Sequence, residues 1–315
     1  MKSTILSVAA FAAVAAAAPA KNNLLAVRQS APAITDGDIL NYALTLEHLE
    51  DKFYREVLDK FSESDFEGAG FPAPFYANLK TVSKDEGTHV SFLTAALKAA
   101  GVTPVEECTY DFGLTSVNMS IATASVLEGV GVSAYLGAAA DIMSKNYLTA
   151  AGSILTVESR HSAYIRDALA QSPFPSPFDV PLKYNEVYTL AAPFIKSCPS
   201  TNPPLPVKAF PMLTASPNNP KTVTSGTKIT LLTDGYTVKA ADGQSQIYAA
   251  FITVTGPVFT EATPVEGGFS LTVPTADEGK APIAGQMYIV LTGCNTVVTD
   301  ETTAAGPAVV EVTPS

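Results

Sequence analysis

Two segments of the chain, offset by 72 residues (86 to 158), repeat the same order of functional residue types. The first reads EGTHVSFLTAAL from Glu86 and the second ESRHSAYIRDAL from Glu158, so each contains Glu-x-x-His followed by an aromatic and an aliphatic residue. A Glu and a His three residues apart lie on one face of an α-helix, where the pair could chelate one metal ion. The aromatic and aliphatic residues continue that face and indicate that it points into a protein core.

The segments before these two repeat as well. Glu47 is followed seven residues later by Tyr54, and Glu128 is followed by Tyr135 at the same spacing, two helical turns along one face. Four predicted helices therefore carry Glu, Glu-x-x-His, Glu and Glu-x-x-His in chain order. Two-metal carboxylate helix bundles have this arrangement. The candidate metal ligands are Glu47, Glu86, His89, Glu128, Glu158 and His161.

The charges of these residues favour a metal site over a plain polar core. Four buried carboxylates repel one another unless cations lie between them. Two divalent ions would balance the four charges, and a ligand set of carboxylates with two imidazoles favours iron or manganese. Only three His occur in the chain, and two of them occupy the repeat. The alternative is a metal-free bundle in which the same residues form a hydrogen-bonded core.

Three neighbouring residues are candidates for supporting the ligands. Glu50 lies closer to the centre of its predicted helix face than Glu47, but the matching position of the repeat is Gly131, so Glu50 is either an extra ligand or a hydrogen-bond acceptor beside the ligands. Tyr54 and Tyr135 are either core residues or hydrogen-bond donors to ligands. His48 points away from the Glu47 face, so we expect it at the surface or between helices.

Apolar periodicity predicts helices over 36–61, 75–100, 117–142 and 145–171 and a short fifth helix around 183–196, with Asp36 or Asp38 capping the first. Residues 199–222 are rich in Pro and read as a linker. Beyond it, from 223 to 315, about seven short Thr/Val/Ile-rich segments predict an antiparallel β-sandwich. The predicted fold class is therefore α+β and multidomain, with an antiparallel four-helix bundle over 35–198 followed by the sandwich.

The N-terminus predicts export. Residues 1–18 have one Lys and a short Ala/Val-rich run, as in a secretory signal peptide, and 19–34 form an arm or a propeptide. No other segment approaches about 18 uninterrupted apolar residues, so we expect no membrane span. The formal net charge of −11 and the lack of a basic patch argue against nucleic-acid binding. We therefore expect a protein that is secreted, extracellular or in the cell wall.

Cysteine usage agrees with an oxidising compartment. We predict a disulfide between Cys108 and Cys198, because both lie in loops at the ends of helical segments of one domain. Cys294 ends an apolar run that we expect to be a buried strand. Asn118 begins a glycosylation acceptor motif near a predicted helix start.

The segments NYALTLEHLEDKFY, DEGTHVSFL and VESRHSAYI resemble the ferritin-like domain of fungal secreted and stress-response proteins of the Rds1 type. Plant desiccation-related proteins are similar. The resemblance covers residues 35–200 and implies a ferritin-like fold with the six candidate ligands given above. It implies no particular reaction, since ferritin-like bundles include iron stores, ferroxidases, peroxidases, manganese catalases and oxygenases.

Two functions follow as hypotheses. The first is a redox-active protein with two iron or manganese ions and oxygen or peroxide as its partner, which would oxidise iron or remove peroxide under stress. The second is a metal-free scaffold that acts at the cell surface or cell wall through its β-sandwich. The chain has no Trp, and no aromatic stripe on the predicted strands marks a sugar-binding platform. We assign the β part no activity.

Overall fold

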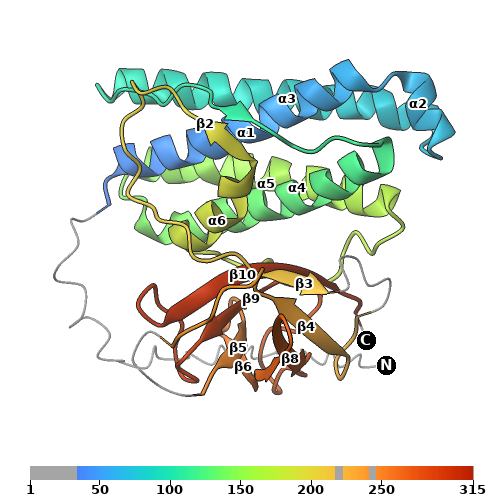
Figure 1. Cartoon of the computed structure of the whole chain (residues 1–315). Coiled ribbons are helices and arrows are strands. Elements are labelled where there is room, and N and C mark those ends of the chain that lie inside the picture. Colours follow the sequence, from blue (N-terminus) through green and yellow to red (C-terminus); the bar gives the residue numbers. More distant parts are fainter. Residues whose placement is uncertain (1–33, 217–222, 241–245, 315) are drawn as a thin grey trace, which may run out of the picture. The chain divides into compact units, whose positions relative to one another are not determined.

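The computed structural model describes residues 34–216, 223–240 and 246–314 (Figure 1). These described residues belong to one compact unit. The predicted signal peptide, and the predicted arm up to residue 33, lie outside the described residues. The domain boundaries proposed from the sequence stay predictions.

The first helix, α1 (Asp36–Lys60), begins differently from the prediction. Its N-cap is Thr35, whose hydroxyl accepts a hydrogen bond from the backbone N–H of Asp38 at 3.2 Å, while the Asp38 carboxylate accepts from the Thr35 N–H at 2.9 Å. This reciprocal capping box satisfies two N–H groups that the first turn leaves open. Asp36 instead accepts hydrogen bonds from the backbone N–H groups of Met143 and Ser144 and so holds the start of a later helix.

The helical part contains five helices of eight or more residues among the described residues. They are α1, α3 (Ala73–Ala99), α4 (Val117–Ala138), α5 (Lys145–Ala168) and α6 (Tyr184–Ala191), with a short α2 (Glu63–Gly68) between α1 and α3. Two 3-10 turns, η2 (Ala139–Asp141) and η3 (Ala192–Phe194), follow α4 and α6. α1 packs mainly against α3, and α4 against α5. Their shared core includes Phe53, Val57, Leu79, Ile121 and Ile165.

A small sheet and a disulfide join the long link before α4 to the chain after α6. Strand β1 (Thr109–Tyr110) pairs antiparallel with β2 (Ile195–Ser197). Directly beside this pair, Cys108 and Cys198 form a disulfide bond across a sequence separation of 90 residues. The bond reduces the conformational entropy of the unfolded chain and so stabilises the folded state.

In the C-terminal part, the described residues form two four-stranded antiparallel sheets, ordered β10-β9-β5-β6 and β3-β4-β8-β7. Their strands are β3 (Thr214–Ser216), β4 (Lys228–Leu232), β5 (Tyr248–Phe251), β6 (Val258–Glu261), β7 (Thr263–Val265), β8 (Gly268–Thr272), β9 (Gly285–Thr292) and β10 (Thr303–Val312). Strand β3 lies within the predicted linker, so strand structure begins earlier than expected. The run that ends at Cys294 is indeed a buried strand, but β9 ends at Thr292 and Cys294 itself is half-buried beyond it.

Strand β9 lies between two apolar cores, which explains why it is apolar at nearly every position rather than at alternate ones. Met287, Ile289 and Leu291 join the core that both sheets share. Tyr288 and Val290 point the other way and join the core of the helices. The sheet that contains β9 therefore packs directly against the helices.

Helix α4 contacts β9 through a stripe of small residues. The Oη of Tyr288 donates a hydrogen bond to the Gly129 carbonyl at 2.8 Å and accepts one from Ser133 Oγ at 3.0 Å. At Gly137, a Cβ would lie 1.8 Å from the Leu182 carbonyl oxygen, so only glycine fits there. The segment Val117–Asp141 is long and apolar enough to span a membrane by composition, but 67% of its apolar window is buried inside the protein. Burial of this kind is typical of a core helix.

Candidate metal centre

The structure brings all six predicted ligand residues together inside the helical part. Glu47 comes from α1, Glu86 and His89 from α3, Glu128 from α4, and Glu158 and His161 from α5. Every one of them is buried, with exposed fractions between 0% and 8%. Helical spacing of three residues places each Glu and His pair on one inward face, as the sequence pattern predicts.

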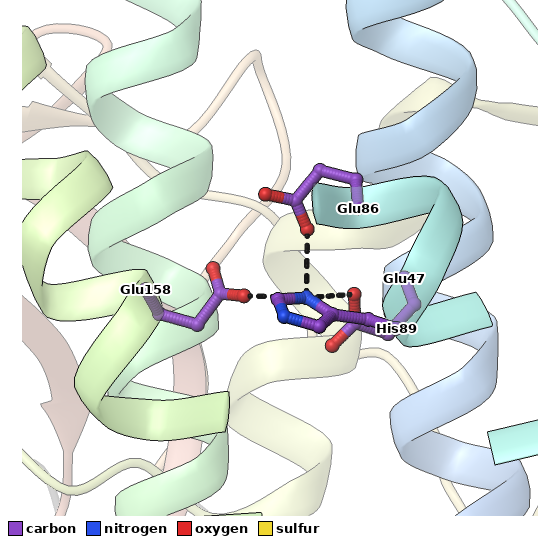
Figure 2. Close-up of side chains that lie close together, drawn as sticks. All are labelled: Glu47, Glu86, His89 and Glu158. Atoms are coloured by element: carbon purple, nitrogen blue, oxygen red, sulfur yellow. Dashed lines mark hydrogen bonds and ion pairs between the residues drawn. The ribbon is translucent and has the colours of Figure 1, made fainter. Parts of the chain in front are cut away.

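One half of the cluster surrounds the imidazole of His89. Its Nδ1 lies 3.2 Å from Glu47 Oε2, 3.2 Å from Glu86 Oε2 and 3.1 Å from Glu158 Oε1 (Figure 2). A ring nitrogen carries at most one proton, so it cannot donate to three carboxylates at once. The three oxygens and the nitrogen thus converge on one small volume, as ligands around a cation do.

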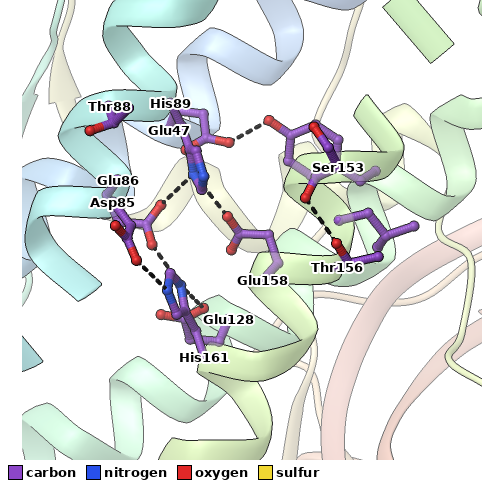
Figure 3. Close-up of polar contacts among 12 residues, drawn as sticks. Glu47, Asp85, Glu86, Thr88, His89, Glu128, Ser153, Thr156, Glu158 and His161 are labelled. Carbon is purple, nitrogen blue, oxygen red and sulfur yellow. Dashed lines mark hydrogen bonds and ion pairs between the residues drawn. The ribbon is translucent and has the colours of Figure 1, made fainter. Parts of the chain in front are cut away.

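The other half surrounds His161. Its Nδ1 lies 2.9 Å from Glu86 Oε1 and 3.6 Å from Glu128 Oε2 (Figure 3). The two oxygens of Glu86 therefore face different imidazoles. Glu86, Glu128, Glu158 and His161 offer ligand atoms within 4.8 Å of one another, and so do Glu47, Glu86, His89 and Glu158. Glu86 and Glu158 belong to both groups, which is the position of carboxylates that bridge two metal ions.

The candidate ligand atoms are better suited to binding metal ions than to hydrogen bonding with one another. Glu86 Oε1, Glu128 Oε2, both Glu158 oxygens and His161 Nδ1 are buried and have no hydrogen-bond partner among the described residues. Glu86 Oε1 and His161 Nδ1 are close, but they do not meet with the alignment of a hydrogen bond. Buried polar atoms without partners are costly and rare in native proteins. A cation between them would satisfy the whole set.

Burial and mutual repulsion shift the acidity of the cluster. Burial raises the pKa of Glu158 and Glu128 well above the usual range, and neighbouring carboxylates add to the shift. Burial also raises the pKa of Glu47, to about 7. Burial alone would raise the pKa of Glu86 too, but contacts with His161 and His89 lower it overall. These opposed shifts are what a cluster of excess carboxylates shows without cations.

The imidazoles shift in the opposite sense from isolated buried His. Burial lowers their pKa, but the surrounding carboxylates outweigh it and raise the pKa of His89 to about 12 and that of His161 to about 9. Without metal, each imidazole is therefore protonated on both ring nitrogens at neutral pH and is itself the cation among the carboxylates.

Two tyrosines of α1 and α4 each donate a hydrogen bond to a glutamate ligand candidate of the other helix. Tyr54 of α1 donates a hydrogen bond to Glu128 Oε1 of α4, and Tyr135 of α4 donates one to Glu47 Oε1 of α1. Each tyrosine thus fixes the carboxylate of the opposite helix and leaves its second oxygen facing the cluster. Of the two alternatives left open by the sequence, the structure places both tyrosines as donors to the predicted ligands.

Glu50 lies beside the cluster but outside both ligand groups. Its side chain is 4% exposed. A Cβ at Gly131 of α4 would lie 2.9 Å from Glu50 Oε1 and 3.3 Å from Glu158 Oε2. The glycine that breaks the sequence repeat therefore makes room for a fifth carboxylate. Burial, followed by repulsion from Glu158, raises the pKa of Glu50 well above its usual range.

The sequence pattern does not predict one further contact at the site. Asp85 Oδ2 lies 3.4 Å from His161 Nε2, so it orients the ring with Nδ1 toward the cluster. The Asp85 side chain is 42% exposed, and no periodic signal distinguishes it from other surface carboxylates.

His48 lies outside the cluster and its Nε2 contacts the Val105 carbonyl at 3.2 Å. Asn118 is exposed in the first turn of α4.

Comparison with known proteins agrees with this geometry. Residues 35–171 match the family model described as ferritin-like domain, and these residues include α1, α3, α4, α5 and all six buried ligand candidates. The helical part of the chain is therefore similar to ferritin-like domains. The chain is 26% identical over 178 residues to Protein rds1 of Schizosaccharomyces pombe, and that alignment covers 56% of this chain. The chain matches only 44% of the length of this curated relative.

Proposed function

We propose that this protein binds two iron or manganese ions between its four long helices and uses them in redox chemistry. The observation that supports this most strongly is the sharing of Glu86 and Glu158 by two buried groups of four ligands, each completed by one glutamate and one histidine. Glu47 and His89 would complete one site, and Glu128 and His161 the other. Two divalent ions would balance the four ligand carboxylates.

We infer that α1, α3, α4 and α5 form an antiparallel four-helix bundle, since each contributes to one core and one polar cluster. We likewise infer that the two sheets form a β-sandwich, because residues of both share a single apolar core. A rigid frame of this kind holds ligands in place when ions bind or leave.

The chain's own residues would prepare the site in three ways. Tyr54 and Tyr135 hold Glu128 and Glu47, so these carboxylates present one oxygen each to the cluster. Asp85 fixes the tautomer of His161. Near-complete burial excludes bulk water, which strengthens electrostatic interactions inside the site. When bound, a pair of iron or manganese ions supplies reversible oxidation states for electron transfer to oxygen or peroxide.

We propose iron oxidation or peroxide removal in the extracellular space or cell wall as the biological setting. The disulfide between Cys108 and Cys198 fits an oxidising compartment. The predicted signal peptide points the same way. A role in the stress response rests on the resemblance to the Rds1 type alone.

The test is metal loading of the full chain as it is secreted. We expect about two iron or manganese ions per chain by elemental analysis after reconstitution and desalting, with loss of both in Glu86→Ala, because this carboxylate belongs to both groups. His161→Ala should lose mainly one ion. Oxygen or peroxide consumption upon addition of Fe²⁺ would then distinguish the two reactions. Failure of the wild-type chain to retain any metal would refute the proposal and favour the scaffold hypothesis.

A further inference from the structure

An apolar cavity of about 340 Å³ lies next to the carboxylate cluster. Helices α1 and α4 contribute Leu46, Leu49, Val126 and Val130 to its wall. The segment from α6 to η3 and the strands β3 and β10 close the other side, with Leu190 and Phe194 among the lining residues. The volume is within the range of pockets that bind small organic molecules.

One charged group lines this apolar cavity. Glu50 is buried and lies at the cavity wall together with Gly131. No hydrogen bond to its carboxyl group occurs among the residues that the structure describes. The absent side chain at Gly131 leaves the Glu50 and Glu158 carboxylates close to the same backbone position, so the cavity ends directly beside a predicted bridging ligand.

The chemistry of the wall selects the occupant. Its aliphatic side chains and Phe194 favour an apolar body, and Glu50 supplies a hydrogen-bond acceptor whether it is ionised or protonated. The neighbouring carboxylates repel an anion. A hydroxyl group satisfies the Glu50 oxygen without requiring a particular charge state, whereas an ammonium group requires an ionised Glu50.

We propose that this cavity binds a small apolar molecule with one hydroxyl group, such as a phenol, whose hydroxyl donates to Glu50 beside the cluster. As a binding site the cavity does not depend on bound metal. That its occupant is a substrate of the metal centre rests on the function proposed above.

Binding can be measured with 2-naphthol, which fits the cavity and whose fluorescence is not masked, because the chain has no Trp. Naphthalene, the same ring system without the hydroxyl, is the matched ligand. We expect the wild-type chain to bind 2-naphthol about five- to tenfold more tightly than naphthalene, the worth of one net hydrogen bond. This preference should persist in Glu50→Gln, whose amide oxygen accepts, and disappear in Glu50→Leu.

Two cavity-filling variants locate the site. Ala191→Phe and Leu190→Phe each add volume to the lining and should weaken both ligands at least about tenfold, in samples whose fold is verified by circular dichroism and thermal unfolding. Unchanged binding in the folded filling variants, or equal affinity of the wild type for both ligands, would overturn the proposal. Metal content is measured in the same samples. Loss of metal with retained naphthol binding counts against the proposed function and leaves the binding site standing.

Discussion

Replacing Glu158 with Gln should stabilise the metal-free protein and yet remove its response to metal. Both carboxylate oxygens of Glu158 are fully buried and make no hydrogen bond within the described part of the chain. Without metal this charge opposes folding, because burial and the neighbouring Glu86 raise its pKa despite the contact with the protonated His89. A neutral amide of nearly the same shape removes that cost.

The magnitude follows from the buried charge, which the amide removes without changing the number of hydrogen-bond partners. Replacing buried charged groups by neutral ones often stabilises a fold by about 1–4 kcal/mol, so we expect a gain within that range in the unfolding free energy at pH 7 without metal. A carboxyl whose folded pKa lies above its unfolded value loses stability as pH rises past the unfolded pKa. The gain should therefore shrink toward zero near pH 4, where the unfolded carboxyl becomes protonated.

With bound metal, we expect the wild type to be more stable than Glu158→Gln, the reverse of the order without metal. At 100 times its dissociation constant, one bound ion stabilises the wild type by about 2.7 kcal/mol. Glu158 belongs to both ligand groups, so the variant should lose most of this gain at both sites. The assay is urea unfolding with a chelator and with Mn²⁺, and Asp167→Asn on the exposed face of α5 is the control. A variant that is less stable than the wild type without metal, with no Mn²⁺ effect in either protein, would refute the reasoning and indicate a hydrogen-bonded core.

Three further predictions concern the frame and the acidity of the site. Gly137→Ala should destabilise the fold by about 1–3 kcal/mol, because its Cβ would meet the Leu182 carbonyl. Gly152→Ala has open space around its Cβ and should not destabilise the fold. Thermal unfolding measures both variants, and equal melting temperatures would contradict the packing at Gly137. Cys108→Ser should lower the unfolding free energy by about 2–5 kcal/mol in urea, an effect that reductant should reproduce in the wild type. Metal binding must displace a proton from His161, because the carboxylates raise its pKa to about 9. The Mn²⁺ affinity should therefore rise about tenfold per pH unit between pH 6 and 8. Calorimetry that finds no rise in affinity would contradict this prediction.

The helical part could be predicted closely because its signals are local and periodic. The spacing of Glu86 from His89 and of Glu158 from His161 places each pair on one helix face, and the four-helix order follows from matched repeats. The crosswise contacts of Tyr54 and Tyr135 depend on how α1 and α4 face each other. Sequence spacing gives the helix face of a tyrosine but does not give its partner across the core.

Other features depend on tertiary contacts that leave little trace in the sequence. Strand β3 is only three residues long, too short to show an alternating pattern, so the Pro-rich composition around it predicts a linker. Its pairing with β4 is a tertiary contact. Asp85 contacts His161 only because α3 and α5 bring them together. The break in the repeat at Gly131 was visible in the sequence, but the room it makes for Glu50 emerges only in three dimensions.

The most direct test of the two-metal proposal is anomalous diffraction from crystals of the full chain reconstituted with iron or manganese. The proposal predicts two peaks, one beside Glu47 and His89 and the other beside Glu128 and His161, both in contact with Glu86 and Glu158. A reconstituted crystal with no peak at this cluster, and with the imidazoles still hydrogen-bonded to the carboxylates, would contradict it.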